Sequence, residues 1–353
     1  MYLYKHFMER RKLMKKLFVL LFTCVMVMSL VACGGSSGES ADSGESEAVT
    51  LTLAHTRPEG SSADLAIREF CDEVTEATNG TVTFEIYPAQ QLGDYSAVFE
   101  RVMIGDVDMQ LAGLPTSVDK FFGFGTGAYL ASNWDEAKEL FSSGGTLMNE
   151  VSAKLDEYGI TYLCMYPNYF GGIALHTEPI DPTNPDATSG IKIRVPDLTQ
   201  FELTAEAFGY LATPLASSDT FTALQTGVVD GALGMGAEGY YSNFSDLVDY
   251  YLPINDHFET WNLIINKEKF ESLSEEQQEA IKEAAANMES KRWEVAEDET
   301  AEYEQKLADN GTVIVEFTDE ELKAFQEKAR EEVWPAMRED FGPDLFDEIT
   351  KDL

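Results

Sequence analysis

The stretch SEEQQEAIKEAAANMESKRWEVAEDETAEYEQKLA, residues 274–308, decides much of the fold, because it contains neither Gly nor Pro. It opens with the capping box SEEQ at 274–277, which predicts the first turn of a helix, and Asn310-Gly311 supplies the stop. Apolar residues recur along it at helical spacing. Such a helix would be about 50 Å long, longer than a small domain is wide. We therefore expect it to brace two domains at once.

Short β-like runs and amphipathic helices alternate along the chain before this stretch. The expected strands are 49–55, 81–87, 108–112, 160–166, 172–176, 191–195, 228–230 and 260–266. The expected helices are 63–78, 94–104, 197–208 and 218–226, and a second capping box at 318–321 starts a further helix that ends before Pro335. This alternation favours an α/β protein with mostly parallel sheets, in two units between which the chain crosses.

The charge balance excludes one class of partner. The chain has 353 residues, with 25 Lys and Arg against 63 Asp and Glu, and a formal net charge of −38. A nucleic acid would be repelled by almost any face of such a protein. With 44% hydrophobic residues the composition is that of a globular protein.

The N-terminus is interpreted as an export signal. Residues 1–32 contain an apolar run at 17–31 after two lysines, too short to cross a bilayer but suited to the core of a signal peptide. The letters LVAC at 30–33 resemble a bacterial lipobox, in which the peptide is cut before Cys33 and that thiol is lipidated. The alternative is a plain signal peptide with an incidental cysteine. Residues 33–47, rich in Gly, Ser and acids, are predicted to form a flexible tether to a folded part at 48–353.

Catalytic and metal-binding patterns are weak. Cys71 and Cys164 lie in apolar surroundings and are predicted to be buried rather than paired. His55 ends one expected strand and His257 precedes another, so either side chain can lie at a cleft or act as a structural hydrogen-bonding group. No metal-ligand spacing or nucleophile–base pattern accompanies them, so we predict no cofactor, no metal and no enzymatic activity.

A glycine-rich segment, GMGAEG at 234–239, fits the dinucleotide-binding pattern and follows an expected strand. It lies late in a chain that is exported and strongly acidic, where a nicotinamide cofactor would not be recycled. We interpret it instead as a turn that lets the backbone approach a ligand or a neighbouring strand.

Arg194 is the arginine whose position is most informative. In IKIRVP at 191–196 the two isoleucines and Val195 share an apolar face, and Arg194 projects from the other face at the strand end. Ligands of open α/β sheets bind outside the carboxyl ends of strands, where a guanidinium offers a two-donor fork for a carboxylate. The alternative is a structural ion pair.

Four segments together resemble the DctP-type solute-binding proteins of tripartite ATP-independent periplasmic (TRAP) transporters. They are YPAQQLG at 87–93, GDVDM at 105–109, GIKIRVP at 190–196 and ALQTGVVDG at 223–231. The resemblance covers about residues 50–315. It implies a two-domain periplasmic-binding-protein-like fold, with hinge strands and a long helix spanning both domains. We expect lobes of about 48–165 with 255–285, and 166–254, followed by C-terminal helices within 274–353.

The resemblance also implies a ligand and a partner. Closure around a small organic acid would precede its handover to a membrane permease driven by an ion gradient. The family's ligand-anchoring arginine corresponds to Arg194. Two other family features are missing: NYFGG at 168–172 lacks a second arginine, and Gly234 stands where many members have Asn.

Aromatic residues near these segments shift the expected ligand. They favour a more apolar or aromatic acid than a C4-dicarboxylate, although aromatic side chains also fill cores. The predicted ligand-binding residues are Arg194, His55, Arg57, Tyr169, Phe170, Gly234 and Trp261.

The sequence thus predicts a monomeric, lipid-anchored, extracytoplasmic solute-binding protein that serves a TRAP permease. Two alternatives stay open at this point: a ligand sensor that reports to a membrane receptor, and an exported enzyme built on the same frame.

Overall fold

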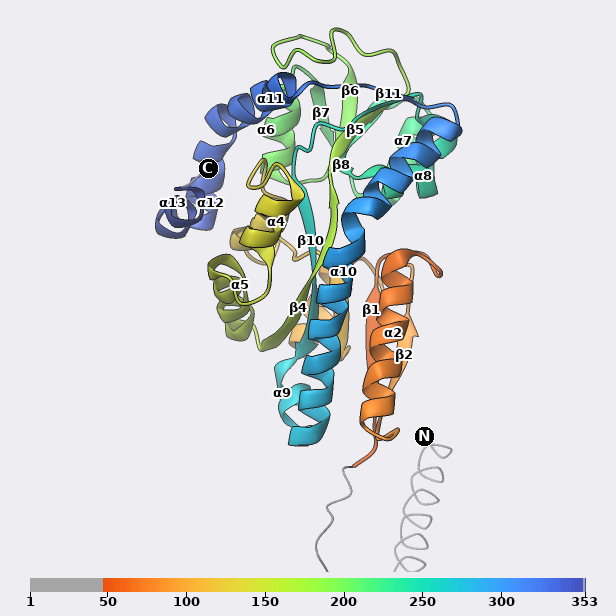
Figure 1. Ribbon diagram of the computed structural model, residues 1–353, viewed down its shortest axis with the longest axis vertical. Coiled ribbons are helices and arrows are strands. Elements are labelled where there is room, and N and C mark those ends of the chain that lie inside the picture. Colours follow the sequence, from red (N-terminus) through yellow and green to blue (C-terminus); the bar gives the residue numbers. More distant parts are fainter. Residues whose placement is uncertain (1–46, 352) are drawn as a thin grey trace, which may run out of the picture. The chain divides into compact units, whose positions relative to one another are not determined.

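Two β-sheets with helices around them form the part of the chain that the computed structural model describes, residues 47–351 and 353 (Figure 1). The first sheet has five strands, in the order β2 (Val82–Tyr87), β1 (Val49–His55), β3 (Met109–Ala112), β10 (Phe258–Asn266) and β4 (Ile160–Phe170). The second has six, in the order β11 (Val313–Ile314), β9 (Tyr250–Leu252), β5 (Gly172–Leu175), β8 (Gly231–Met235), β6 (Lys192–Val195) and β7 (Leu211–Pro214).

Both sheets are mixed rather than mostly parallel, which corrects the expectation from the sequence. In the first sheet β1 runs parallel to β2 and β3, whereas β10 is antiparallel to β3 and β4. In the second, β6 is parallel to β7 and β8, whereas β5 is antiparallel to β8 and β9. The parallel strands are joined through helices, as parallel pairing requires. The antiparallel ones, β10 and β5, begin just after the chain has crossed from the other sheet.

Helices connect and cover these strands. Those before the long helix are α2 (Ser62–Ala77), α3 (Tyr95–Met103), α4 (Trp134–Phe141), α5 (Thr146–Glu157), α6 (Thr199–Ala207), α7 (Thr220–Gln225), α8 (Ala237–Phe244) and α9 (Lys267–Glu271). Short 3₁₀ segments lie at Lys120–Thr126, Ser217–Asp219 and Ser245–Leu247. α2 packs on β2, α3 on β3 and α5 on β4, while α6 and α8 pack on strands of the second sheet.

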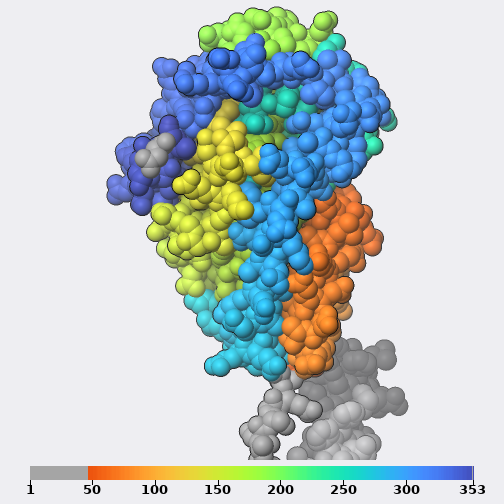
Figure 2. Space-filling model, viewed as in Figure 1, coloured from red at the N-terminus to blue at the C-terminus, as the bar shows by residue number. Residues whose placement is uncertain are grey.

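The long helix is confirmed. α10 spans Glu275–Asp309, and both hydrogen bonds of the predicted capping box at Ser274 are present. Ile281 packs in a core cluster with α2 and the first sheet, whereas Leu307 packs in a cluster with α8 and the second sheet. Figure 2 shows the blue helix running along the surface beside the orange segment that contains α2. The same helix therefore packs on elements of both sheets.

The crossing from the first sheet to the second is unusually short. Only Gly171 separates β4 from β5. A Cβ atom on Gly171 would lie 2.2 Å from Cε1 of His257, and one on Gly172 would lie 2.6 Å from the carbonyl oxygen of Leu252. The glycine pair is required here because the neighbouring strand passes too close for any side chain.

Three C-terminal helices follow α10: α11 (Asp319–Glu332), α12 (Trp334–Phe341) and α13 (Pro343–Thr350). The predicted capping box at Thr318 is present. α11 packs on α6, and α12 packs on the 3₁₀ segment Lys120–Thr126.

Most predicted strand boundaries agree with the structure to within two residues, and two regions differ more. The run 228–230 is not a strand: Val228 N–H bonds back to Ala223 at the end of α7, and β8 starts at Gly231. β4 continues four residues beyond the expected end at 166. Cys71 and Cys164 are buried free thiols, as predicted. The predicted signal peptide at 1–32, Cys33 and all of the tether except residue 47 lie outside the described residues.

Candidate functional site

A cavity of about 520 Å³ lies where strands of the two sheets end. Its lining includes residues at or just after the carboxyl ends of β1, β3, β6 and β8, the edge at which α/β sheets bind ligands. From the first sheet and its loops come Arg57, Tyr95, Gly113, Glu259 and Trp261; from the second come Arg194, Pro196, Gly234, Met235 and Phe244. Tyr169, at the end of β4, also lines it.

Arg194 is buried in the wall of this cavity, and the described part of the chain supplies no counter-ion for it. Its neighbours Ile193 and Val195 are fully buried, and Arg194 is 4% exposed. The Nε atom donates a hydrogen bond to the carbonyl oxygen of Leu215 at 3.0 Å. Among residues 47–351 and 353, no carboxylate forms an ion pair with this guanidinium. The structural ion pair considered as the alternative is therefore absent from the described part of the chain.

Arg194 remains positively charged although it is buried. Desolvation lowers the pKa of the guanidinium to about 10, because burial disfavours the charged form. At neutral pH the group is still protonated. A buried, uncompensated positive charge costs several kcal/mol of stability, in order of magnitude, and an anion entering the cavity would offset that cost.

Arg57, two residues after β1, is held by other groups. Its Nη2 atom forms an ion pair with Glu238 at 3.5 Å. Its guanidinium lies 4.9 Å from the ring centroid of Trp261 and 6.0 Å from that of Tyr169, within cation–π range. Burial would lower the pKa of Arg57, but Glu238 and other nearby groups outweigh it and raise the pKa. Arg57 thus has a carboxylate partner, whereas no carboxylate among the described residues pairs with Arg194.

A charged cluster behind the same wall was not predicted. His257 Nδ1 lies 2.6 Å from Oδ2 of Asp256, and its Nε2 lies 3.5 Å from Oε2 of Glu259. Burial lowers the pKa of His257, but the two carboxylates outweigh burial and raise it to about 9. Glu259 also accepts a hydrogen bond from Trp261 Nε1 at 2.8 Å. The imidazolium is therefore charged at neutral pH, and Glu259 links it to the cavity.

The glycine-rich turn has the structural role expected of it. Gly234 has φ of +96°, and a Cβ there would lie 2.6 Å from Cγ of Pro196. A Cβ on Gly236 would lie 2.5 Å from the ring of Tyr169. The end of β8 and the residue after it carry these glycines because two cavity-wall residues, Pro196 and Tyr169, pack directly on the backbone there.

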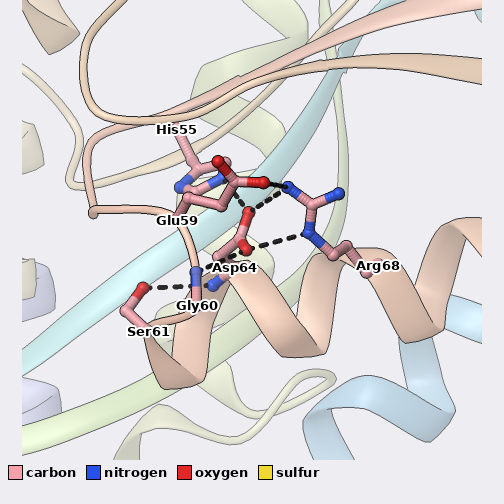
Figure 3. Close-up of polar contacts among 6 residues, drawn as sticks. All are labelled: His55, Glu59, Gly60, Ser61, Asp64 and Arg68. Carbon is pink, nitrogen blue, oxygen red and sulfur yellow. Dashed lines mark hydrogen bonds and ion pairs between the residues drawn. The ribbon is translucent and has the colours of Figure 1, made fainter.

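His55 does not line the cavity, contrary to expectation. Its side chain is buried, and Nε2 lies 3.1 Å from Oδ1 of Asp64 (Figure 3). That carboxylate also accepts a hydrogen bond from Gly60 N–H at 2.8 Å and from Arg68 Nε at 2.9 Å. Burial lowers the pKa of His55, and Asp64 only partly offsets this. Of the two possibilities that the sequence left open, His55 is therefore the structural hydrogen-bonding group. It links the end of β1 to the start of α2.

Phe170 is also absent from the cavity. Its ring packs 5.0 Å from that of Phe258 and 5.4 Å from that of Trp134, between ring centroids. The reason is the extended length of β4: successive side chains on a strand point to opposite faces, so Tyr169 faces the cavity and Phe170 the core. Of the seven residues expected from the sequence, the structure brings five together at the cavity: Arg194, Arg57, Tyr169, Gly234 and Trp261.

Within the described ranges, 47–351 and 353, no three His, Cys, Asp or Glu side chains are grouped so that they would hold a metal ion. The helices in this part of the chain also include none with the length and apolarity needed to cross a bilayer.

Comparisons with known proteins agree with this architecture. A solute-binding protein of Roseobacter denitrificans is 27% identical over 329 residues, 92% of this chain and 97% of its own. The C4-dicarboxylate-binding periplasmic protein DctP of Rhodobacter capsulatus is 25% identical over 286 residues, 80% of this chain and 84% of its own.

Solved structures show the same fold. A TRAP periplasmic solute-binding protein of Haemophilus influenzae, solved with bound L-gulonate, has a TM-score of 0.77 at 24% identity, covering 86% of this chain and 99% of its own. An extracytoplasmic solute receptor of Bordetella pertussis that binds pyroglutamic acid has a TM-score of 0.75 at 23% identity, covering 86% and 100%. The family model described as bacterial extracellular solute-binding protein, family 7, matches residues 53–340. With two sheets, a helix that packs on both and a cavity at their strand ends, the chain belongs to this DctP family of solute-binding proteins.

Proposed function

We propose that this protein captures a small organic acid outside the cytoplasmic membrane and delivers it to a TRAP-type permease. One observation carries the proposal. Arg194 is a buried, protonated guanidinium that lines the cavity and has no carboxylate partner among the described residues. A ligand carboxylate would supply the missing counter-ion and form charge-assisted hydrogen bonds with it.

The arrangement of the walls supports capture by closure. Arg194 comes from the second sheet, whereas Arg57 and Trp261 come from the first sheet and its loops. A hinge motion between the sheets would change the distance between these groups and would exclude water from a bound acid. Relatives of known structure bind L-gulonate and pyroglutamic acid, both small carboxylates.

Export and anchoring remain part of the proposal. The signal at 1–32 and the lipobox at 30–33 would place the folded part, as a monomer, on the outer face of the cell membrane. Its relatives in the comparisons are described as binding proteins, and we propose no catalytic activity and no cofactor for this one.

A thermal-shift screen tests the function. Residues 48–353 would be heated with a library of small carboxylates and with uncharged analogues of the same size. A ligand that binds only the folded state raises the melting temperature, so we expect specific carboxylates to do so and their amides not to. Stabilisation by amides as strong as that by the acids would contradict the proposed role of Arg194.

A further inference from the structure

The largely buried charges around the cavity are balanced before any ligand enters, and Asp94 adds one exposed carboxylate to the lining. Three cations are at or just behind its wall: Arg194, Arg57 and His257. Three carboxylates oppose them: Glu238 pairs with Arg57, Asp256 pairs with His257, and Glu259 is the third. Among these, Arg194 has no ion-pair partner in the described part of the chain. The wall is therefore a better match for a ligand whose own charges cancel than for a dianion.

Glu259 is the carboxylate that can reach a ligand. It lines the cavity, and its side chain is 12% exposed. One oxygen accepts a hydrogen bond from Trp261, and the other is 3.5 Å from His257, which is held more closely by Asp256. An ionised carboxylate has about four acceptor positions on its two oxygens, so Glu259 keeps free capacity toward the cavity.

Tyr95 shows that the two charges act on the same space. This residue lines the cavity, and burial is the main cause that raises the pKa of its hydroxyl to about 12. Asp94 and then Glu259 raise this pKa further, whereas Arg194 lowers it. One side chain of the wall therefore lies within electrostatic reach of both Arg194 and Glu259.

We propose that the cavity selects a zwitterion, with the ligand carboxylate at Arg194 and a protonated nitrogen at Glu259. This inference rests on the proposed function, since it assumes that an acid binds at Arg194. It goes further by excluding dicarboxylates as preferred ligands. A second ligand carboxylate would face Glu259, a like charge in a water-poor site, and like charges juxtaposed in an interface are strongly unfavourable.

Three acids of matched length distinguish these possibilities. 4-Aminobutanoate, pentanoate and glutarate share a carboxylate on three methylene groups and differ in the last group, which is ammonium, methyl or carboxylate. Titration calorimetry measures the affinity of each acid. The series is repeated with chains one methylene shorter and with chains one and two methylenes longer, so that the comparison does not depend on the distance between the two end groups. At the best length, we expect the amino acid to bind about tenfold or more tighter than the methyl analogue, and the dicarboxylate to bind weakest.

The matched variant is Glu259→Gln. A glutamine oxygen can still accept the hydrogen bond from Trp261, so the fold should be kept, which circular dichroism would check. We expect the preference for the amino acid over the methyl analogue to fall about tenfold. Asp94→Asn tests the other carboxylate of the cavity lining, which is exposed and caps α3. Asn also caps helices. Because exposed charges are screened, we expect this variant to change the preference less than Glu259→Gln does, and an equal or larger change would move the ligand nitrogen from Glu259 to Asp94.

The outcomes separate this inference from the function beneath it. If glutarate or pentanoate binds tighter than the amino acid at every length, or if Glu259→Gln leaves the preference unchanged, the zwitterion proposal is overturned while acid binding stands. If none of the twelve acids binds the wild type, a panel of α-amino acids decides: binding that Glu259→Gln weakens supports the proposal, whereas binding that Glu259→Gln leaves unchanged, or no binding at all, overturns it. If acids bind equally well to an Arg194→Ala variant, the proposed function itself fails.

Discussion

Arg292 on the long helix α10 holds the backbone of Pro167 on β4, with Nε 2.9 Å from the carbonyl oxygen. Nη2 of the same guanidinium donates to the carbonyl oxygen of Asn168 at 3.1 Å, and its Cζ lies 5.1 Å from the ring centroid of Tyr166. Glu299, two turns further along the helix, pairs with Nη1. Arg292 thus fixes the strand a few residues before the chain crosses to the second sheet.

Replacing Arg292 with Met should destabilise the protein. The two carbonyl oxygens lose their donor and Glu299 loses its partner, so we expect the free energy of unfolding to fall by about 2–3 kcal/mol. Urea unfolding followed by circular dichroism measures this change. The control is Arg338→Met, which removes an exposed ion pair with Asp347 and should have little effect. Equal urea midpoints for wild type and Arg292→Met would show that these contacts of Arg292 add nothing to stability.

Arg194→Met should separate function from stability. In the absence of ligand, removing a buried charge that has no carboxylate partner among the described residues should stabilise the protein by about 1 kcal/mol or more. The affinity for the best carboxylate should fall by about 2–5 kcal/mol, roughly 30-fold to several thousand-fold. Arg194→Lys keeps the charge but not the planar fork, so its loss of affinity should be smaller. Titration calorimetry and urea unfolding give the two readings.

Arg57→Met is the matched comparison for Arg194. It breaks the ion pair with Glu238 and the contact with Trp261, so it should destabilise the protein and weaken binding less than Arg194→Met does. The opposite pattern, near-native affinity in Arg194→Met and a large loss in Arg57→Met, would move the anchoring role to Arg57.

The pKa of His257 predicts a dependence of stability on pH. Because the folded-state pKa is raised to about 9 from an ordinary 6.5, the folded protein binds the proton more tightly than the unfolded chain. The resulting stability, roughly 3 kcal/mol, is fully present below pH 6.5 and is lost as the pH rises to 9. Urea unfolding between pH 6 and pH 9.5 measures it.

His257→Gln is the reference for that experiment. The variant should be less stable at neutral pH, since Asp256 and Glu259 lose their counter-charge, but its unfolding free energy should change less between pH 6.5 and 9. If the variant and the wild type lose stability in parallel over this range, another group causes the pH dependence.

Cys33→Ser tests the anchor. Without the thiol no lipid can be attached, so the protein should move from the membrane fraction to the soluble fraction of the producing cells. Immunoblotting of both fractions after a salt and carbonate wash shows the distribution. Cys71→Ser, which changes a buried thiol in the folded part, should leave the protein at the membrane. Retention of the Cys33→Ser protein would mean that the lipobox interpretation is wrong.

The sequence predicted the features that depend on local patterns. The capping box at Ser274 and a run free of Gly and Pro specified α10, and the alternation around Arg194 placed its side chain opposite two buried neighbours. Both signals are contained in fewer than 40 consecutive residues.

Features that depend on pairing between distant strands were not predicted. β10 is buried on both faces, so no alternation along it marks Glu259 as facing the cavity. The position of Phe170 depended on how far β4 extends, which its pairing with Phe258 sets. The role of His55 could not be predicted without knowing its partner Asp64, which a helix places next to the end of the strand.

The place of β10 in the first sheet has a consequence for synthesis. It lies between β3 and β4, although it is the last of the five strands in the chain. Until residue 266 has been made, β3 and β4 each present an unpaired edge, and such edges invite pairing with other chains. A nascent chain that stops before residue 258 therefore lacks β10, the strand that joins β3 to β4 in the first sheet. Premature termination should yield aggregating fragments rather than a stable N-terminal half.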